Sequence, residues 1–163
     1  MSKSILTQVL LHKHFTYSDG KLFWKLPNAK YQKPGDLAGY LSGKYWRVRL
    51  FGDDYILHRL IYLFHHSVLP TIVDHKDRNT LNNCISNLRP ASAEQNSQNS
   101  SKQLNNTTGY KGVSKQKGRL NYRAQIWHNN KRVHLGYFET AEKAYAKYCE
   151  AATTLHKEYA CID

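Results

Sequence analysis

One segment, VDHKDRNTLNNCISNLRPASAEQN, combines side chains that could hydrolyse a phosphodiester bond. It places Asp74 and His75 at the end of a short predicted strand. Asn87 follows in the return loop, and Asn96 lies inside the next predicted helix. Carboxylate and amide oxygens are hard ligands, which suit Mg²⁺ or Mn²⁺ better than zinc. A neutral imidazole could take a proton from a water aimed at phosphorus while the metal neutralises charge on the leaving oxygen, so these residue types predict one-metal hydrolysis.

Each of these residues also has an ordinary structural explanation. Asp74 could cap the following loop, Asn87 could hold a turn, and Asn96 could be a solvated residue on a polar helix. Asparagine tolerates left-handed backbone and bonds to its own chain, so the other asparagines of the loop are assigned to turns: Asn79, Asn82 and Asn83. Catalysis is favoured by the conjunction of residues at this spacing and not by any one of them.

The segment and its neighbours resemble a known family. HRLIYLFHH is followed by VDHKDRNTLNN and then by SNLR and AEQNSQN, with twelve residues from His75 to Asn87 and nine from Asn87 to Asn96. Over residues 17–100 this pattern resembles the HNH nucleases of the ββα-metal fold, especially the homing endonucleases of phages and introns. The resemblance implies that Asp74 and Asn96 bind the metal. It also implies that His75 is the general base and that Asn87 holds the loop bearing it.

Three further positions bear on this resemblance. The third position of the motif is Asn96 rather than the histidine that names the family, a replacement that this branch often makes. The replacement weakens a claim of zinc or nickel affinity, so a divalent Mg²⁺ or Mn²⁺ is the expected cofactor. His58 could contact a phosphate or simply pack at a helix start, and both interpretations stay open. Arg59 beside it is the second candidate for a phosphate contact.

The net charge indicates an anionic partner. The chain has 163 residues, with 24 Lys and Arg against 12 Asp and Glu, which gives +12 and a pI near 9.6. Hydrophobic residues make up 40%, too many for a disordered tail, and no apolar run is long enough to span a membrane. The three cysteines favour neither a disulfide framework nor a four-cysteine zinc site, and no secretion signal is recognisable. We expect a reduced, cytoplasmic protein, in the host cell if the gene is phage-encoded.

Charge and composition divide the chain into two modules. From Lys102 to Arg132 there are eight Lys or Arg and no acid. The run from Asn96 to Gly109 is rich in Asn, Ser, Gln and Thr and cannot bury enough apolar surface to fold alone. The sequence therefore predicts an α+β protein with a nuclease module over residues 1–100, a linker over 101–108 and a second domain over 109–163.

Local patterns predict the elements of each module. The first module is expected to begin with a short helix ending before Tyr17 and a hairpin around Ser18–Gly20. Two strands, KYWRVRLF and DYILHRL, are expected to follow around a turn at Gly52–Asp54, and then a helix from His58 to His66. The module is expected to end with the strand TIVDH and a helix over Ala91–Gln98 that has a Ser92–Gln95 capping box. The second is expected to contain strands KGVSK, NYRAQIWH and KRVHLGYF, then a helix capped by Thr140 with three residues against the sheet: Ala144, Tyr148 and Ala151.

Alternation along the second module's strands separates a buried face from a basic one. Four residues are predicted to point inward: Ala124, Ile126, Val133 and Leu135. Five residues without an acid among them are predicted on the other face: Arg123, Gln125, Trp127, Arg132 and His134. Such a composition is unusual for a surface that contacts only water, although a solvated basic face is the open alternative.

Residues 109–160 resemble the plant ethylene-response-factor (Apetala-two) DNA-binding domain, which also occurs in phage homing endonucleases. GVS and HLGYFETAEKAYAKY carry the resemblance. It implies that the three-stranded sheet lies in the DNA major groove with six residues toward DNA: Lys111, Ser114, Gln125, Trp127, Arg132 and His134. Four more basic residues complete the predicted DNA-binding set: Lys115, Lys117, Arg119 and Arg123. Several of these differ from the plant residues, so the plant target sequence does not transfer.

These patterns together predict a metal-dependent DNA endonuclease of the homing type that nicks or cleaves both strands, with sequence recognition helped by the second domain. Double-stranded DNA is the expected partner, with neither a membrane nor a small-molecule substrate, and the oligomeric state is open. Phosphate contacts would dominate affinity, and Arg132 and Gln125 are the candidates for base edges. The alternative is a non-catalytic DNA-binding regulator on a nuclease scaffold. An RNA-binding protein is a third hypothesis, but the sequence has none of the usual sheet motifs whose aromatic residues stack on RNA bases.

Overall fold

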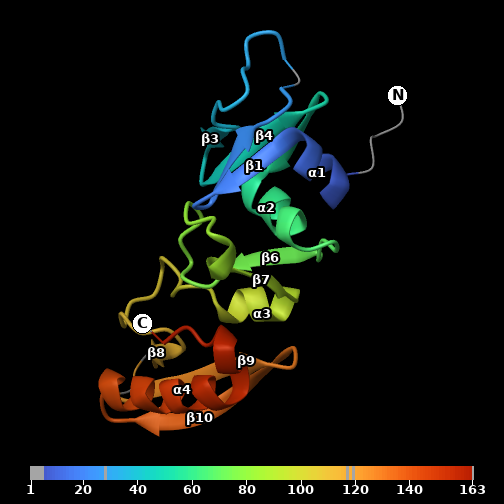
Figure 1. Ribbon diagram of the computed structural model, residues 1–163. Helices are drawn as coiled ribbons and strands as arrows, with labels where there is room; N and C mark the ends of the chain where they lie inside the picture. The colour runs from blue at the N-terminus through green and yellow to red at the C-terminus, as the bar shows by residue number, and fades with distance from the viewer. Residues whose placement is uncertain (1–5, 28, 117, 119, 163) are drawn as a thin grey trace. The chain divides into compact units, whose positions relative to one another are not determined.

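The computed structural model describes residues 6–27, 29–116, 118 and 120–162. In this part of the chain it contains four α-helices and several small antiparallel sheets (Figure 1), which confirms the predicted mixed α+β class. Contacts between Cα atoms divide the chain into two compact units, Met1–Ala91 and Ser92–Asp163. This division falls before the third helix, whereas composition puts the end of the first module at residue 100. The helix therefore groups with the second unit.

The first unit begins with a hairpin at the turn that the sequence predicts. β1 (Phe15–Ser18) pairs with β2 (Lys21–Trp24) through Asp19 and Gly20, both of which have positive φ. Glycine is required at the second turn position for another reason as well. A Cβ on Gly20 would lie 2.7 Å from the backbone nitrogen of Cys84, so the hairpin turn packs directly on a distant loop.

A three-stranded sheet follows in the first unit. β4 (Tyr45–Leu50) pairs with β5 (Asp53–Ile56), as predicted, and β3 (Tyr40–Ser42), which the sequence did not indicate, adds a third strand beside β4. The prediction that a strand continues through DYILHRL was wrong. The strand ends at Ile56 because the apolar residues that follow are spaced for a buried helical face.

Two helices cover the core of the first unit. α1 (Gln8–His14) begins at Thr7, whose side chain accepts from the Leu10 amide. α2 (Leu57–His65) buries one face, and these residues join the hairpin residues in one apolar cluster: Leu11, Phe15, Leu22, Val48, Leu60 and Ile61. Each fully buried aliphatic side chain contributes about 1.5–3 kcal/mol relative to exposure, so this cluster holds the helices on the sheets.

A second hairpin carries the segment that could do chemistry. β6 (Ile72–His75) pairs with β7 (Leu88–Ala91), and the 3₁₀ turn η1 (Ile85–Asn87) precedes β7. The sequence predicted β6 but described the residues after Asn87 as a return loop. Pairing with β6, which places Val73 opposite Pro90 and His75 opposite Leu88, makes them a strand.

The second unit begins with a short helix and ends with a long one. α3 (Ala93–Gln98) has the predicted capping box: the Ser92 side chain accepts from the Gln95 amide, and the Gln95 side chain accepts from the Ser92 amide. α4 (Ala141–His156) begins behind Thr140, whose side chain accepts from the Lys143 amide. The 3₁₀ turn η2 (Lys157–Tyr159) follows α4.

A three-stranded sheet lies against α4 in the order β10-β9-β8 (Figure 1). Its strands are β8 (Val113–Lys115), β9 (Tyr122–His128) and β10 (Lys131–Phe138). The core between sheet and helix contains residues from both: Val113, Ala124, Ile126, Ala144, Tyr148 and Ala152. Ala152 is fully buried and the predicted Ala151 only partly, a shift of one position around the helix. Within the described ranges, no helix has both the length and the apolar character needed to cross a bilayer.

Candidate active site and nucleic-acid interface

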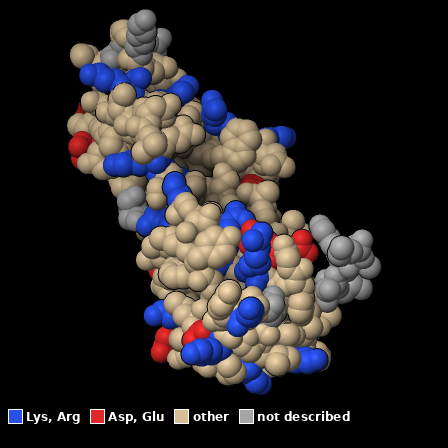
Figure 2. Space-filling view, turned by 90° about the horizontal axis from the view of Figure 1, so that it is seen from above, with Lys and Arg blue, Asp and Glu red and all other residues tan. Residues whose placement is uncertain are grey.

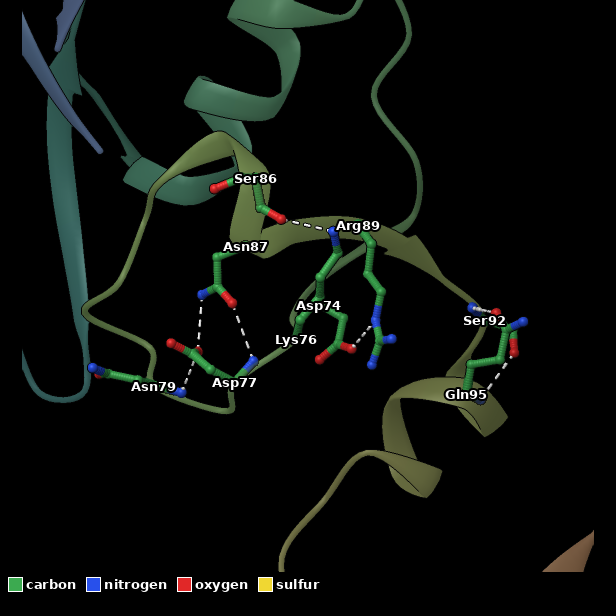
Figure 3. Close-up of polar contacts among 9 residues, drawn as sticks. All are labelled: Asp74, Lys76, Asp77, Asn79, Ser86, Asn87, Arg89, Ser92 and Gln95. Carbon is green, nitrogen blue, oxygen red and sulfur yellow. Dashed lines mark hydrogen bonds and ion pairs between the residues drawn. The ribbon is translucent and has the colours of Figure 1, made fainter. Parts of the chain in front are cut away.

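Asp74 lies near the end of β6 in a buried ion pair. The strand register places it opposite Arg89 of β7, and the Arg89 Nε donates to Asp74 Oδ2 at 2.9 Å (Figure 3). Both side chains are only 7% exposed. Removing two charges from water is costly, and close pairing offsets that cost only when the geometry is good. Arg89 therefore holds the Asp74 carboxylate in a defined position, a partnership that the sequence pattern did not reveal.

His75 ends β6 with its imidazole enclosed by two neighbours. Its Nε2 lies 3.0 Å from the Oδ1 of Asn83, and the residue is 5% exposed. On another side its ring meets that of His58, with the centroids 4.7 Å apart in an edge contact. Asn83 was predicted as a turn residue, and its contact with a side chain eight positions away has no periodic signature in the sequence.

Asn87 ties together the loop between β6 and β7. Its Nδ2 donates to Asp77 Oδ1 at 2.9 Å, and its Oδ1 accepts from the Asp77 amide at 3.1 Å (Figure 3). The Nδ2 also donates to the Asn82 carbonyl at 2.8 Å. Burial would raise the pKa of Asp77, but hydrogen bonds from Asn82, Asn87 and the Asn79 amide outweigh it and hold the pKa below its ordinary value. Asn87 thus has the contacts expected of a residue that orders this loop.

The two predicted phosphate contacts occupy different environments. His58 is buried against Tyr45 and His75, with ring centroids 5.6 Å and 4.7 Å away. Burial, with smaller electrostatic contributions from His75 and Arg59, lowers the pKa of His58 from 6.5 to about 3, so the ring is neutral at pH 7. Arg59 is half-buried, and its Nη1 donates to the Thr71 carbonyl at 2.7 Å. These contacts favour the packing interpretation of His58.

The predicted metal ligands supply one carboxylate and one amide. Asn96, the second of them, is exposed on α3 in the second unit. Among the described residues, no group of three or more His, Cys, Asp or Glu could hold a metal ion. A Mg²⁺ ion is usually bound through one or two protein oxygens, with water and substrate phosphate completing its shell, whereas structural zinc sites need four protein ligands. Carboxylate and amide oxygens are donors that suit a hard divalent cation of the first kind.

The basic face of the second unit's sheet is assembled from all three strands. Pairing places Ser114 beside Arg123, His134 beside Gln125, and Arg132 beside Trp127. Their alternation puts them opposite the buried Ala124 and Ile126, as the sequence predicts. The prediction that Val133 is also buried was wrong: it lies on the edge strand β10 and is 38% exposed. Trp127 is 48% exposed even though it is a large aromatic residue. An exposed aromatic ring among cationic and amide side chains can contact both the sugar-phosphate backbone and base edges.

A β-bulge adds Tyr137 to this face. The register shifts between His134 and Gly136, so Tyr137 and not Gly136 pairs with Arg123. Simple alternation from His134 would have put Tyr137 on the helix side. Its ring instead lies 4.7 Å from that of His134, and its hydroxyl accepts from the Gln116 side chain at 3.3 Å. A bulge inserts one residue and thereby reverses the facing of every residue after it.

The remaining predicted DNA-binding residues are placed differently. The Lys111 ammonium donates to the carbonyls of Gln98 and Ser100, at 2.6 Å and 2.5 Å, and so holds the C-terminal end of α3 within the second unit. Lys115 is paired with Tyr122 and lies over its ring, on the side of the sheet opposite to Ser114. Lys117 and Arg119 lie outside the described residues.

An open cavity of about 510 Å³ lies in the second unit where β8 no longer covers β9. Its walls include residues of the basic face together with the buried end of α4: Lys111, Gln125, Trp127, Arg132 and His156. His156 donates from Nε2 to the Trp127 carbonyl at 2.9 Å, and burial lowers its pKa. Figure 2 shows one side of the molecule, on which Lys and Arg are widespread and Asp and Glu are few.

Comparison with known proteins bears on the segment that contains Asp74, His75, Asn87 and Asn96. Residues 55–98 match the model of a protein family described as HNH endonuclease. No curated protein and no solved structure matches the chain. HNH nucleases act on DNA and generally use a divalent metal, and this segment contains carboxylate and amide oxygens and an imidazole. The match at residues 55–98 therefore supports a nuclease of the HNH type.

Proposed function

We propose that this protein is a metal-dependent DNA endonuclease of the homing type in which His75 is the general base. The observation that carries the proposal is the adjacency of Asp74 and His75 at the end of β6 within the HNH match. Asp74 and Asn96 are the proposed ligands of Mg²⁺ or Mn²⁺. When bound, such an ion polarises the phosphate and neutralises charge on the leaving oxygen.

The residues of the chain supply the remaining chemistry. His75 takes the proton of the attacking water while the water oxygen forms its bond to phosphorus and the bond to the leaving oxygen breaks. Asn87 keeps the His75 loop in one conformation through its bonds to Asp77 and Asn82. Arg89 keeps the Asp74 carboxylate oriented. In this proposal, most of the residues that take part in the reaction therefore belong to the first unit.

The second unit is proposed to supply affinity and part of the sequence recognition. Its sheet carries a basic and aromatic face, and its sequence resembles the ethylene-response-factor type of DNA-binding domain. Arg132 and Gln125 are the proposed readers of base edges, because Arg forms bidentate bonds to guanine and Gln to adenine. Phosphate contacts by the other basic residues make binding strongly salt-dependent.

One assay tests the nuclease proposal against its alternatives. Supercoiled plasmid carrying random inserts and a matched RNA are incubated with the full chain and Mg²⁺ or Mn²⁺, with and without EDTA. Nicked or linear plasmid that disappears with EDTA is the expected result. A gel shift of DNA without strand breaks would instead identify a regulator, and cleavage of RNA alone would contradict DNA as the substrate. A coding region inserted within an intron or between genes would support the homing type.

A further inference from the structure

The geometry points to Asn83 as the positioning residue that sets the orientation and the tautomer of the His75 ring. The inference rests on the proposed role of His75 as general base, because only then does its tautomer matter for the reaction. The residue was predicted to be a turn former. The residue is instead 3% exposed, and its side chain lies in hydrogen-bond contact with the His75 imidazole.

The contact assigns the proton on the His75 ring. Asn83 Oδ1 lies 3.0 Å from His75 Nε2, and the amide oxygen can only accept. The Asn83 Nδ2 is directed toward the Leu81 carbonyl, 3.5 Å away, which agrees with this orientation of the amide. With this orientation of the amide, Nε2 carries the hydrogen, and the lone pair of the neutral ring is on Nδ1. A carbonyl partner on one ring nitrogen selects the tautomer of the other in this way.

Asn83 is itself held by parts of the first unit that are distant in sequence. A Cβ on Gly20 would lie 2.9 Å from the Asn83 carbonyl carbon, so the β1–β2 turn packs on this backbone. The Ile85 amide donates to the Tyr17 hydroxyl at 3.1 Å, which fixes the chain two residues later. Asn87 bonds to the carbonyl just before Asn83. The acceptor is thus placed by the core of the unit and not by a solvated turn.

Neighbouring asparagines show what a turn residue does in the same loop. Asn79 accepts from the Leu81 amide, and Asn82 donates to the Asp77 carboxylate at 2.7 Å. Both bonds stay within the loop, and neither residue is buried to the extent of Asn83. Asn79 and Asn82 therefore stabilise the loop itself, whereas Asn83 is the one of the three whose side chain contacts His75, the proposed general base.

Nitrogen NMR of the full chain tests the inference without metal or DNA. Histidine imidazoles are labelled with ¹⁵N, and the His75 signals are identified by their loss in His75→Gln. The wild-type signals should show a protonated Nε2 and an unprotonated Nδ1 at neutral pH. Asn83→Leu, which removes the acceptor at similar volume, should lose this pattern. Asn83→Asp, which keeps an acceptor oxygen in place, should keep the hydrogen on Nε2. Asn82→Ala is the matched loop control and should leave the His75 tautomer unchanged.

Cleavage kinetics provide the second readout. Asn83→Leu should lower kcat by about 100-fold or more with KM unchanged, because general-base catalysis contributes about 10²–10⁴ to a rate, and Asn83→Asp should recover part of the loss. A wild-type His75 protonated on Nδ1, or a folded Asn83→Leu that keeps the Nε2–H pattern, overturns the inference. If Asn83→Leu does not fold, the spectra of wild type and Asn83→Asp decide. Absence of any nuclease activity would refute the proposed function but leave the tautomer result valid.

Discussion

Arg89 and Asp74 face each other across the β6–β7 ladder, and the guanidinium Nε donates to the carboxylate at 2.9 Å with both side chains buried. The arginine therefore lies next to the proposed metal ligand and stabilises it when no cation is present. A buried charge that has lost its partner is far more costly than an exposed one. This relationship makes Arg89 a determinant of stability within the HNH segment.

Replacing Arg89 with Met should destabilise the first unit by about 3–5 kcal/mol, because Asp74 would remain buried and would lose its ion pair with Arg89. Urea denaturation of the full chain measures the change. The matched control is Arg49→Met, which removes an exposed arginine 3.6 Å from Asp54 and should cost less than about 1 kcal/mol. Equal losses for the two variants would show that the Arg89 pair carries no special stability.

His75→Ala should abolish cleavage while DNA binding persists, because the general base acts on water and contributes little to DNA affinity. Plasmid nicking and gel shift on the same preparation separate the two properties. The expected loss in rate is about 10²–10⁴-fold. Loss of DNA binding by a normally folded His75→Ala would contradict the assigned role.

Stability should fall as the pH is lowered from 7, partly through His58. The pKa of this ring is lowered to about 3 in the folded state, whereas an unfolded histidine titrates near 6.5, so the unfolded chain binds more protons between these values. The free energy of unfolding therefore decreases on acidification by up to about 1.4 kcal/mol per pH unit. Urea denaturation at pH 7, 6 and 5 should show a shallower dependence for His58→Gln than for wild type. Parallel curves would mean that His58 is protonated as easily when folded as when unfolded.

Asn87→Ala should loosen the loop between β6 and β7. It removes two donated bonds and one accepted bond, and losing such a hydrogen bond costs about 0.5–1.5 kcal/mol each. Hydrogen exchange of the Asp77 amide should accelerate, and kcat should fall because His75 is no longer held in one position. Asn105→Ala, at an exposed site outside the loop, is the control and should change neither quantity. If the Asp77 amide stays protected from exchange in Asn87→Ala, Asn87 does not hold this loop in one conformation.

The two sides of the second unit's sheet should differ in DNA binding. Arg132→Ala, on the basic face, should weaken binding to the recognised site by about 1–3 kcal/mol and should relax base preference at one position. Lys115→Ala removes a positive charge from the other side of the same sheet and should have a smaller effect. Fluorescence titrations at several salt concentrations compare the variants. A larger loss for Lys115→Ala would place the DNA on the opposite side.

Much of the local structure followed from local signals. The capping box at Ser92 and Gln95, the cap at Thr140 and the hairpin turn at Asp19 and Gly20 depend on residues within a few positions of one another. Such interactions are encoded by spacing and therefore can be read directly. The strand β7 was missed for the converse reason, because its four residues LRPA contain a proline and become a strand only by pairing with β6.

The sequence by itself determined the HNH motif, the residue types of a hard-cation site and the alternation that separates a basic face from a buried one. Tertiary structure alone decided that Arg89 pairs with Asp74, that Asn83 contacts His75, that Lys111 holds the end of α3, and that a bulge brings Tyr137 onto the basic face. These relationships depend on strand register and on loops packed against distant turns. Periodicity describes which side of an element a residue occupies, but only the folded chain determines which side chain lies opposite it.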